Sequence, residues 1–144
     1  MPSVSDSIVI NAPADATWAV VREFNGLADW HPAIAASEIE GGGPPNEVGA
    51  IRKLTTMDGG IIRETLLEHS DTDRYLKYDV IEAPTPVSDY IGEARVTPEA
   101  EDRSRLVMTS SFAVEPELEQ EMVDLFGKTL IPGGLAAVKA SVEK

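Results

Sequence analysis

The chain has 144 residues, of which 42% are hydrophobic and 26% are charged, a composition typical of globular proteins of one domain. Its net charge of −13 repels the phosphates of nucleic acids and anionic membrane surfaces, so we expect no nucleic acid among its partners. The absence of cysteine excludes disulfides, thiolate catalysis and cysteine-ligated metal sites.

The first third of the chain predicts one strand, two short helices and a second strand. The segment "SVSDSIVIN" (3–11) ends in branched aliphatic residues, as strands often do. Pro13 and Asp15 then suit the first turn of a helix, because proline fits that position and the helix dipole favours an acid there. A shorter helical turn follows and is closed by Pro32. A short strand comes before the loop rich in glycine and proline.

The middle of the chain predicts an antiparallel meander. It begins with a hairpin at 49–68, whose two halves flank a Met-Asp-Gly-Gly turn. Three further strand segments follow, at 74–84, 86–99 and 104–115. In the first of these, Leu76, Tyr78 and Val80 alternate with polar residues and therefore share one face.

The last segment, 116–144, predicts a long helix with one interruption. Pro116 suits the first helical position, and apolar residues that include Met122 and Phe126 recur at helical spacing. The stretch "IPGGL" (131–135) opposes this pattern, because an interior proline costs about 3 kcal/mol and each glycine about 1 kcal/mol. We expect a kink there, or two helices. The order of elements indicates an α+β protein whose sheet is covered on one face by this helix.

Four stretches carry a resemblance to a known family. They are "INAPADATWAVVREFNGLADWHP" (10–32), "VGAIRKL" (48–54), "RETLLEHS" (63–70) and "YLKYDVIEAPTPVSDYIGEARVTP" (75–98). In this order and spacing they resemble the START-like helix-grip superfamily (SRPBCC), in its polyketide cyclase/dehydrase branch. The resemblance runs nearly from end to end, so it implies a single domain over 1–144. The interrupted segment 131–135 departs from the unbroken helix that the family leads us to expect.

The resemblance implies a helix-grip fold, in which a curved antiparallel sheet of six to seven strands surrounds a long C-terminal helix. Two short helices would close one end. Between the sheet and the helix the family has a deep, mostly apolar cavity. Family members bind lipids, polyketides or aromatic metabolites there, and a minority catalyse reactions such as cyclisation or dehydration.

The predicted hairpin places Arg52 and Glu64 among apolar residues. With a three-residue loop at 58–60, Leu54 lies opposite Glu64, and the two charged residues are diagonal neighbours on one face. A two-residue loop would place them on opposite faces. The resemblance turns the face with Arg52 and Glu64 inward, where an isolated charge is costly, so we expect the two residues to pair or to hold water.

Three roles are open for this pair. It can be an ion pair that only fixes the sheet, or it can orient the polar end of a ligand. Alternatively, Glu64 can act as a catalytic acid or base with a pKa raised by burial. Because the sequence holds no strong catalytic constellation, we rank binding above catalysis.

Other candidates lie on faces that the resemblance turns inward or at the mouth. Tyr78 and Tyr90 can offer hydroxyls to a ligand or pack in the core. His31 can act as an acid or base near neutral pH, or can satisfy a backbone group. The candidate ligand-binding residues are Arg52, Glu64, Tyr78, Tyr90, Trp30, His31, Met108, Met122 and Phe126, and the candidate catalytic residues are Glu64 and His31.

The sequence predicts neither a metal nor a cofactor, because its two histidines lack metal-ligand spacing and no phosphate-binding motif is present. No apolar run approaches the roughly 18–20 residues of a membrane span, and 1–12 lack a signal-peptide pattern, so we expect a cytoplasmic protein without membrane insertion. We expect a small hydrophobic or amphipathic ligand in an internal cavity. The alternatives are a cyclase/dehydratase-type enzyme and a protein-interaction or stress-response module without cavity chemistry. A monomer and a homodimer are both compatible with the sequence.

Overall fold

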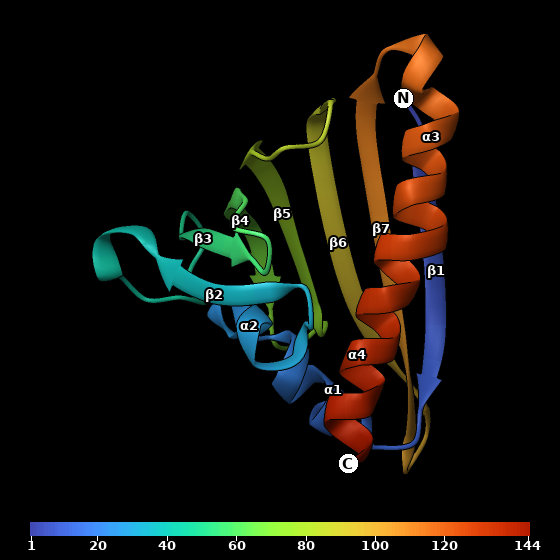
Figure 1. Cartoon of the computed structure of the whole chain (residues 1–144). Coiled ribbons are helices and arrows are strands. Elements are labelled where there is room, and N and C mark those ends of the chain that lie inside the picture. Colours follow the sequence, from blue (N-terminus) through green and yellow to red (C-terminus); the bar gives the residue numbers. More distant parts are fainter.

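The computed structural model describes all residues from Met1 to Lys144 and contains one antiparallel sheet of seven strands (Figure 1). The strands are β1 (Ser3–Ile10), β2 (Ile34–Ile39), β3 (Ile51–Thr56), β4 (Ile61–Ser70), β5 (Tyr75–Glu82), β6 (Val87–Ala100) and β7 (Arg103–Val114). Their order in the sheet is β1-β7-β6-β5-β4-β3-β2, so every neighbouring pair except β1 and β7 is consecutive in the chain. The predicted meander is confirmed.

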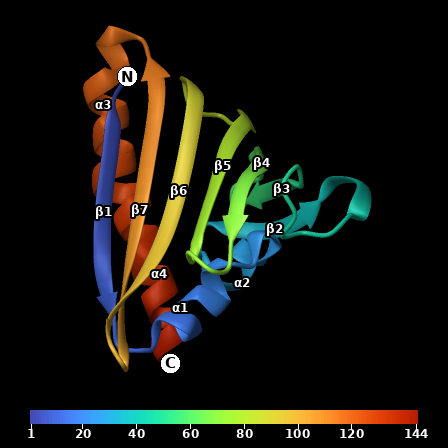
Figure 2. The ribbon, with the colours of Figure 1, turned by 180° about the vertical axis from the view of Figure 1, so that it is seen from behind.

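Helices cover one end and one face of this sheet. Between β1 and β2 lie α1 (Ala14–Val21), the short 3-10 helix η1 (Phe24–Gly26) and α2 (Leu27–Trp30), and η2 (Glu40–Gly42) follows β2. The C-terminal helix consists of η3 (Pro116–Leu118), α3 (Glu119–Asp124), η4 (Leu125–Leu130) and α4 (Ile131–Glu143). Figure 2 shows the curved sheet with this helix behind β1, β7 and β6. This is the helix-grip fold that the sequence predicted.

The predicted interruption of the C-terminal helix takes a different form. The helix neither splits nor ends at 131–135; instead η4, just before it, is a π-helix. The N–H of Ile131 donates to the carbonyl of Phe126, five residues back, and Leu130 and Ile131 both keep right-handed helical angles. Pro132 falls in the first turn of α4, where proline is tolerated. In place of the expected kink or split at 131–135, the helix continues through a π turn directly before this segment.

The hairpin of β3 and β4 confirms that Arg52 and Glu64 share one face, but its register differs from the predicted one. Its three-residue loop is 57–59 and not 58–60, because the N–H of Thr56 donates to the carbonyl of Gly60 at 2.9 Å. Gly59, with φ of +91°, takes the left-handed conformation that such loops require. Arg52 therefore lies directly opposite Glu64, and the predicted diagonal arrangement was wrong.

The core contains two clusters of buried apolar residues. The larger one joins the sheet to α1 and α4 and includes Trp18, Leu66 and Leu135. The smaller one consists of Tyr90, Phe112, Met122 and Phe126. None of the helices has the length and apolar composition of a membrane span.

Candidate functional site

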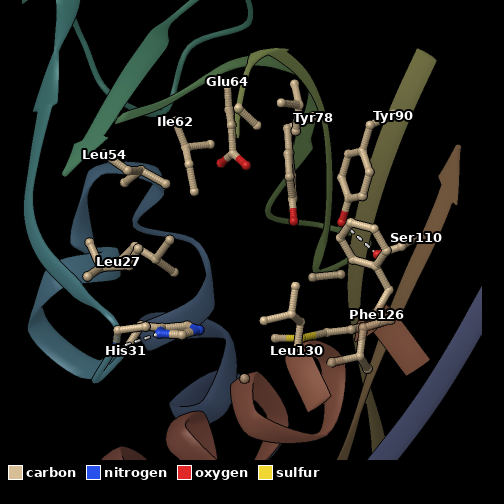
Figure 3. A pocket seen from close by; sticks show the side chains of 18 of the residues that line it. Leu27, His31, Leu54, Ile62, Glu64, Tyr78, Tyr90, Ser110, Phe126 and Leu130 are labelled. Carbon is tan, nitrogen blue, oxygen red and sulfur yellow. Dashed lines mark hydrogen bonds between the residues drawn. The ribbon is translucent and has the colours of Figure 1, made fainter. Parts of the chain in front are cut away.

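A cavity of about 310 Å³ lies between the sheet and the C-terminal helix. It is lined by 29 residues, of which 18 are hydrophobic, so most of its wall is apolar. The wall is formed by β3 to β7, by the region of α2 and the start of β2, by the loop between β5 and β6, and by η4 and the start of α4. Figure 3 shows side chains from these elements converging on the same space.

Arg52 enters the cavity wall from β3 and is held by the protein itself. Its Nε and Nη2 both lie 2.7 Å from Oε1 of Glu64, and its Nη1 donates to the carbonyl of Phe24 at 2.7 Å. The guanidinium also packs against the rings of Phe24 and Tyr78, at 4.0 and 4.9 Å from their centroids. Each of the three guanidinium nitrogens therefore has a protein partner.

Glu64 enters from β4, directly opposite Arg52, and is only 7% exposed. Its Oε1 accepts both bonds from Arg52, while its Oε2 accepts no hydrogen bond from the protein. In Figure 3 the carboxyl group points into the cavity. Burial raises the pKa of Glu64, and the nearby Arg52 only partly offsets this effect. The carboxyl group thus presents one unpartnered oxygen to an otherwise apolar space.

Tyr78 and Tyr90 enter from β5 and β6 beside this carboxyl group. The hydroxyl of Tyr90 shares a hydrogen bond of 2.6 Å with that of Ser110 on β7. The ring of Tyr78 lies over Gly92, where an added Cβ would be 2.3 Å from Cζ of Tyr78, so only glycine permits this position. Burial is the main cause of the raised pKa of both tyrosines, which keeps both hydroxyls protonated at neutral pH.

His31 reaches the cavity from the end of α2, and Figure 3 shows its ring extending inward. Its Nδ1 accepts the backbone N–H of Ala33 at 3.2 Å, so in the neutral ring Nε2 carries the hydrogen. Burial, and to a lesser degree Arg52, lower the pKa of His31, which favours the neutral ring. The residue therefore satisfies a backbone group, as one of the two alternatives had it, and it also lines the cavity; its role as an acid or base stays a prediction. Trp30 lines the cavity too, and its buried Nε1 has no partner.

The structure brings together eight of the nine predicted ligand-binding residues. Met108 and Phe126 belong to the wall, as predicted. Met122 does not, because it lies one turn before Phe126 on the helix and packs into the smaller core cluster. Met122 is therefore outside the cavity wall, since helical spacing alone does not separate the wall from the packed core, and its role as a ligand contact stays a prediction.

Several wall residues were not predicted from the sequence. They include Leu27, Leu54, Ile62, Ser110, Leu130 and Gly134. Ser110 follows Met108 by two residues on β7 and thus shares its face, which is a signal that alternation could have given. An added Cβ at Gly134 would lie 3.5 Å from Sδ of Met108, an ordinary contact distance, so this position faces the cavity wall at β7.

A second arginine–carboxylate pair lies outside the cavity, where α1 meets the turn between β4 and β5. Oδ1 of Asp71 accepts from Nε1 of Trp18 at 2.8 Å and from Nε of Arg22 at 2.9 Å, and Oδ2 accepts from Nη2 of Arg22 at 3.2 Å. The bonds from Arg22 and then Trp18 lower the pKa of Asp71 to about 2. Nε2 of His69 lies 2.9 Å from the carbonyl of Arg22. This cluster ties α1 to the sheet and leaves no oxygen of Asp71 unpartnered.

The sequence matches a protein family described as polyketide cyclase / dehydrase and lipid transport over residues 1–143. No curated protein matches it. Among solved structures, the protein XoxI from Bacillus cereus is 27% identical, with a TM-score of 0.88 over 100% of this chain and 97% of that chain.

Two solved enzymes have the same fold at lower identity. The Zhui aromatase/cyclase from Streptomyces sp. R1128 is 22% identical, with a TM-score of 0.81 over 99% of this chain and 93% of that chain. Norcoclaurine synthase from Thalictrum flavum, in complex with dopamine and hydroxybenzaldehyde, is 20% identical, with a TM-score of 0.79 over 99% of this chain and 86% of that chain. At this identity the two likenesses show a common fold alone.

Proposed function

The chain belongs to the polyketide cyclase / dehydrase and lipid transport family, and from this premise we propose that it binds a small, mostly apolar molecule with one polar group in the cavity between the sheet and the C-terminal helix. The polar group would lie at Glu64, and the apolar part would lie against residues such as Met108 and Phe126. We assign Arg52, Tyr78, Tyr90, Trp30 and His31 to the surroundings of the polar group.

The size and composition of the cavity support this proposal. Ligand pockets typically measure about 300–1,000 Å³ and have apolar walls with a few placed polar groups. The cavity, at about 310 Å³, lies at the lower end of that range. A cavity of this size suits a small molecule.

The observation that carries the proposal is the unpartnered Oε2 of Glu64. This oxygen is open to the cavity and not sealed in the core, so a hydrogen-bond donor in the cavity can reach it. At the exposed pair of Arg22 and Asp71, by contrast, both carboxylate oxygens have protein partners. A ligand hydroxyl at Glu64 would complete the hydrogen bonding of the site.

Two measurements test this function. Native mass spectrometry of the purified protein, compared with the denatured mass, would reveal a carried ligand as an added mass that denaturation removes. Titration with 2-naphthol, followed by the ¹⁵N–¹H spectrum of the protein, tests binding directly. We expect the shifted amide signals to come from residues around the cavity.

A matched pair of variants tests whether the ligand binds in the cavity. Gly134→Leu puts a side chain on the cavity side of α4, whereas Gly133→Leu puts the same side chain into open space. Both substitutions raise helix propensity by a similar amount. We expect Gly134→Leu to weaken the binding of 2-naphthol at least about tenfold, which corresponds to 1.4 kcal/mol, and Gly133→Leu to leave it unchanged. Equal affinities in both variants would contradict binding in the cavity.

Acid or base catalysis in the same cavity is a second candidate function. The raised pKa of Glu64 and the neighbouring hydroxyl of Tyr78 favour it, because buried carboxyl groups of raised pKa are effective proton donors near neutral pH. His31 is the other candidate acid or base. A search for turnover among aromatic and polyketide-like substrates, with Glu64→Gln as the test variant and Asp71→Asn as control, decides this. Equal turnover in wild type and Glu64→Gln would remove Glu64 from the reaction.

A further inference from the structure

The two members of the buried ion pair, Arg52 and Glu64, differ in how far they are open to a ligand in the cavity. The positive end, Arg52, has a protein partner on every nitrogen and packs against the rings of Phe24 and Tyr78. The negative end, Glu64, points into the cavity with Oε2 unpartnered. A ligand therefore meets a carboxylate oxygen first, although the pair as a whole is neutral.

No other cation is available to an anionic ligand in this space. The lining residues include no lysine, and Arg52 is the only arginine among them. His31 adds no charge, because burial lowers its pKa and favours the neutral ring. The remaining charged residues on the wall are both acidic, Glu23 and Glu93.

Neither of these acids points a free carboxylate into the cavity. Glu93 lies between Gly92 and Ala94, which are buried on the inner face of β6, so its side chain is on the outer face. Oε2 of Glu23 accepts from Arg22 and from Nδ2 of Asn46, and the side chain is 48% exposed, so solvent screens its charge. Glu64 is thus the buried acid whose free oxygen faces a ligand.

Building on the proposed function, we infer that the cavity selects neutral ligands that carry a hydroxyl group and rejects carboxylates and phosphates, free fatty acids included. A ligand hydroxyl donates to the ionised Glu64 carboxylate, and it accepts from the protonated form, so it fits both states. A carboxylate would instead bring a second negative charge close to Glu64 in a site of low dielectric constant, where Glu64 already neutralises the charge of Arg52.

Three probes that share one ring system test this selectivity: 2-naphthol, naphthalene and 2-naphthoate. Their dissociation constants are measured at pH 7.5 by calorimetry, with protein ¹⁵N–¹H spectra to confirm that all of them shift the same cavity signals. We expect 2-naphthol to bind at least about tenfold more tightly than 2-naphthoate, with naphthalene between them. The tenfold ratio corresponds to one good charge-dependent contact of about 1.4 kcal/mol.

The variant Glu64→Gln removes the negative charge and leaves Arg52 without its carboxylate. We expect Glu64→Gln to reduce or reverse the preference of the cavity for 2-naphthol over 2-naphthoate. The control Asp71→Asn, at the exposed pair of Arg22 and Asp71, should leave this preference unchanged. The comparison of probes on the wild-type protein stands by itself if Glu64→Gln fails to fold.

The possible outcomes separate this inference from the proposed function. Tighter binding of 2-naphthoate than of 2-naphthol to the wild-type protein would overturn the inference and would leave the cavity as a binding site. A failure of all three probes to bind would overturn the proposed function, and the inference with it. A selectivity that persists in Glu64→Gln would also overturn the inference, because it would come from another group.

Discussion

Two of the arginine–carboxylate pairs in the molecule, Arg52 with Glu64 and Arg22 with Asp71, have similar distances and opposite properties. In the cavity, Arg52 and Glu64 are 6% and 7% exposed, and burial raises the pKa of the carboxyl group. At the turn between β4 and β5, the side chain of Asp71 is 59% exposed, and hydrogen bonds from Arg22 and Trp18 lower its pKa to about 2. The number of partners and the access of water, and not the presence of an arginine, decide which way the pKa moves.

The difference distinguishes an ion pair that only holds two elements together, at Asp71, from a carboxyl group that is open to a ligand, at Glu64. Asp71 uses both oxygens to hold α1 against the sheet. Glu64 uses one oxygen for Arg52 and leaves the other open to the cavity. Carboxyl groups with a shifted pKa cluster at functional sites, which supports a role for Glu64 in ligand binding.

Arg52→Met should have the largest effect on stability. It leaves Glu64 buried without a partner, and such a loss typically costs about 3–5 kcal/mol. The free energy of unfolding, measured with urea at pH 7.5, checks this. The loss should shrink as the pH falls and Glu64 becomes protonated. Arg22→Met is the matched control at the exposed pair and should cost much less, because exposed pairs contribute little. Equal losses in the two variants would contradict the contrast between the two pairs.

Gly92→Ala should have the next largest effect. It changes the surroundings of the buried pair without touching either charge, because the added Cβ would lie 2.3 Å from Cζ of Tyr78 and would displace the ring. Overpacking of this kind costs about 1–3 kcal/mol. Urea unfolding gives the loss, and the cavity signals in the ¹⁵N–¹H spectrum should move. Gly133→Ala, with nothing within 4 Å of the added Cβ, serves as control. A spectrum of Gly92→Ala that is unchanged around Tyr78 would refute the close packing.

The double variant Arg52→Met, Glu64→Leu should be closer to the wild type in stability than Arg52→Met alone. Replacing a buried ion pair by apolar side chains of similar size is often neutral or stabilising. We expect it to recover most of the stability lost in the single variant, and to bind 2-naphthol no better than naphthalene. A double variant that recovers stability and retains the preference for 2-naphthol would show that the pair has no part in ligand selection.

Asp71→Asn should have the smallest effect, and its pH dependence should have the opposite sign to that of Glu64. The pKa of Asp71 is lowered from 3.8 to about 2, so the stability that its charge contributes is present above pH 4 and is lost as the pH falls towards 2. The pKa of Glu64 is raised above 4.5, so its ionisation lowers stability as the pH rises from 4.5 through the raised value. Urea unfolding of Asp71→Asn and Glu64→Gln against the wild type, from pH 2.5 to 8, separates the two. This assignment would be contradicted if the stability contributed by the two carboxyl groups changed in the same direction with pH.

Much of the fold was predictable because local patterns agree with the overall architecture. Alternation placed Leu76, Tyr78 and Val80 on one face, and all three line the cavity. Parity along the hairpin placed Arg52 and Glu64 together on one face. The exact pairing was not predictable, because Gly59 and Gly60 can each supply the left-handed residue of the loop, and only the folded sheet selects Gly59.

Sequence patterns could not predict contacts between segments that are far apart in the chain. Nothing near Asp71 in the chain indicates that Trp18 and Arg22 donate to it, and nothing near Arg52 indicates the carbonyl of Phe24. The segment 131–135 is unfavourable for a helix by its sequence, but nothing in the sequence indicated the π turn at 125–130 that precedes it.

The most direct test of the contrast between the two pairs is a ¹³C NMR titration of the carboxyl groups of Glu64 and Asp71 in the same sample. We predict that Glu64 titrates above its ordinary value of 4.5 and Asp71 near 2, and that 2-naphthol shifts the titration of Glu64 and leaves that of Asp71 unchanged. A Glu64 midpoint at or below 4.5 that is insensitive to 2-naphthol would show that Arg52 dominates the carboxyl group, and it would contradict the assignment of Glu64 as the open polar group of a binding site.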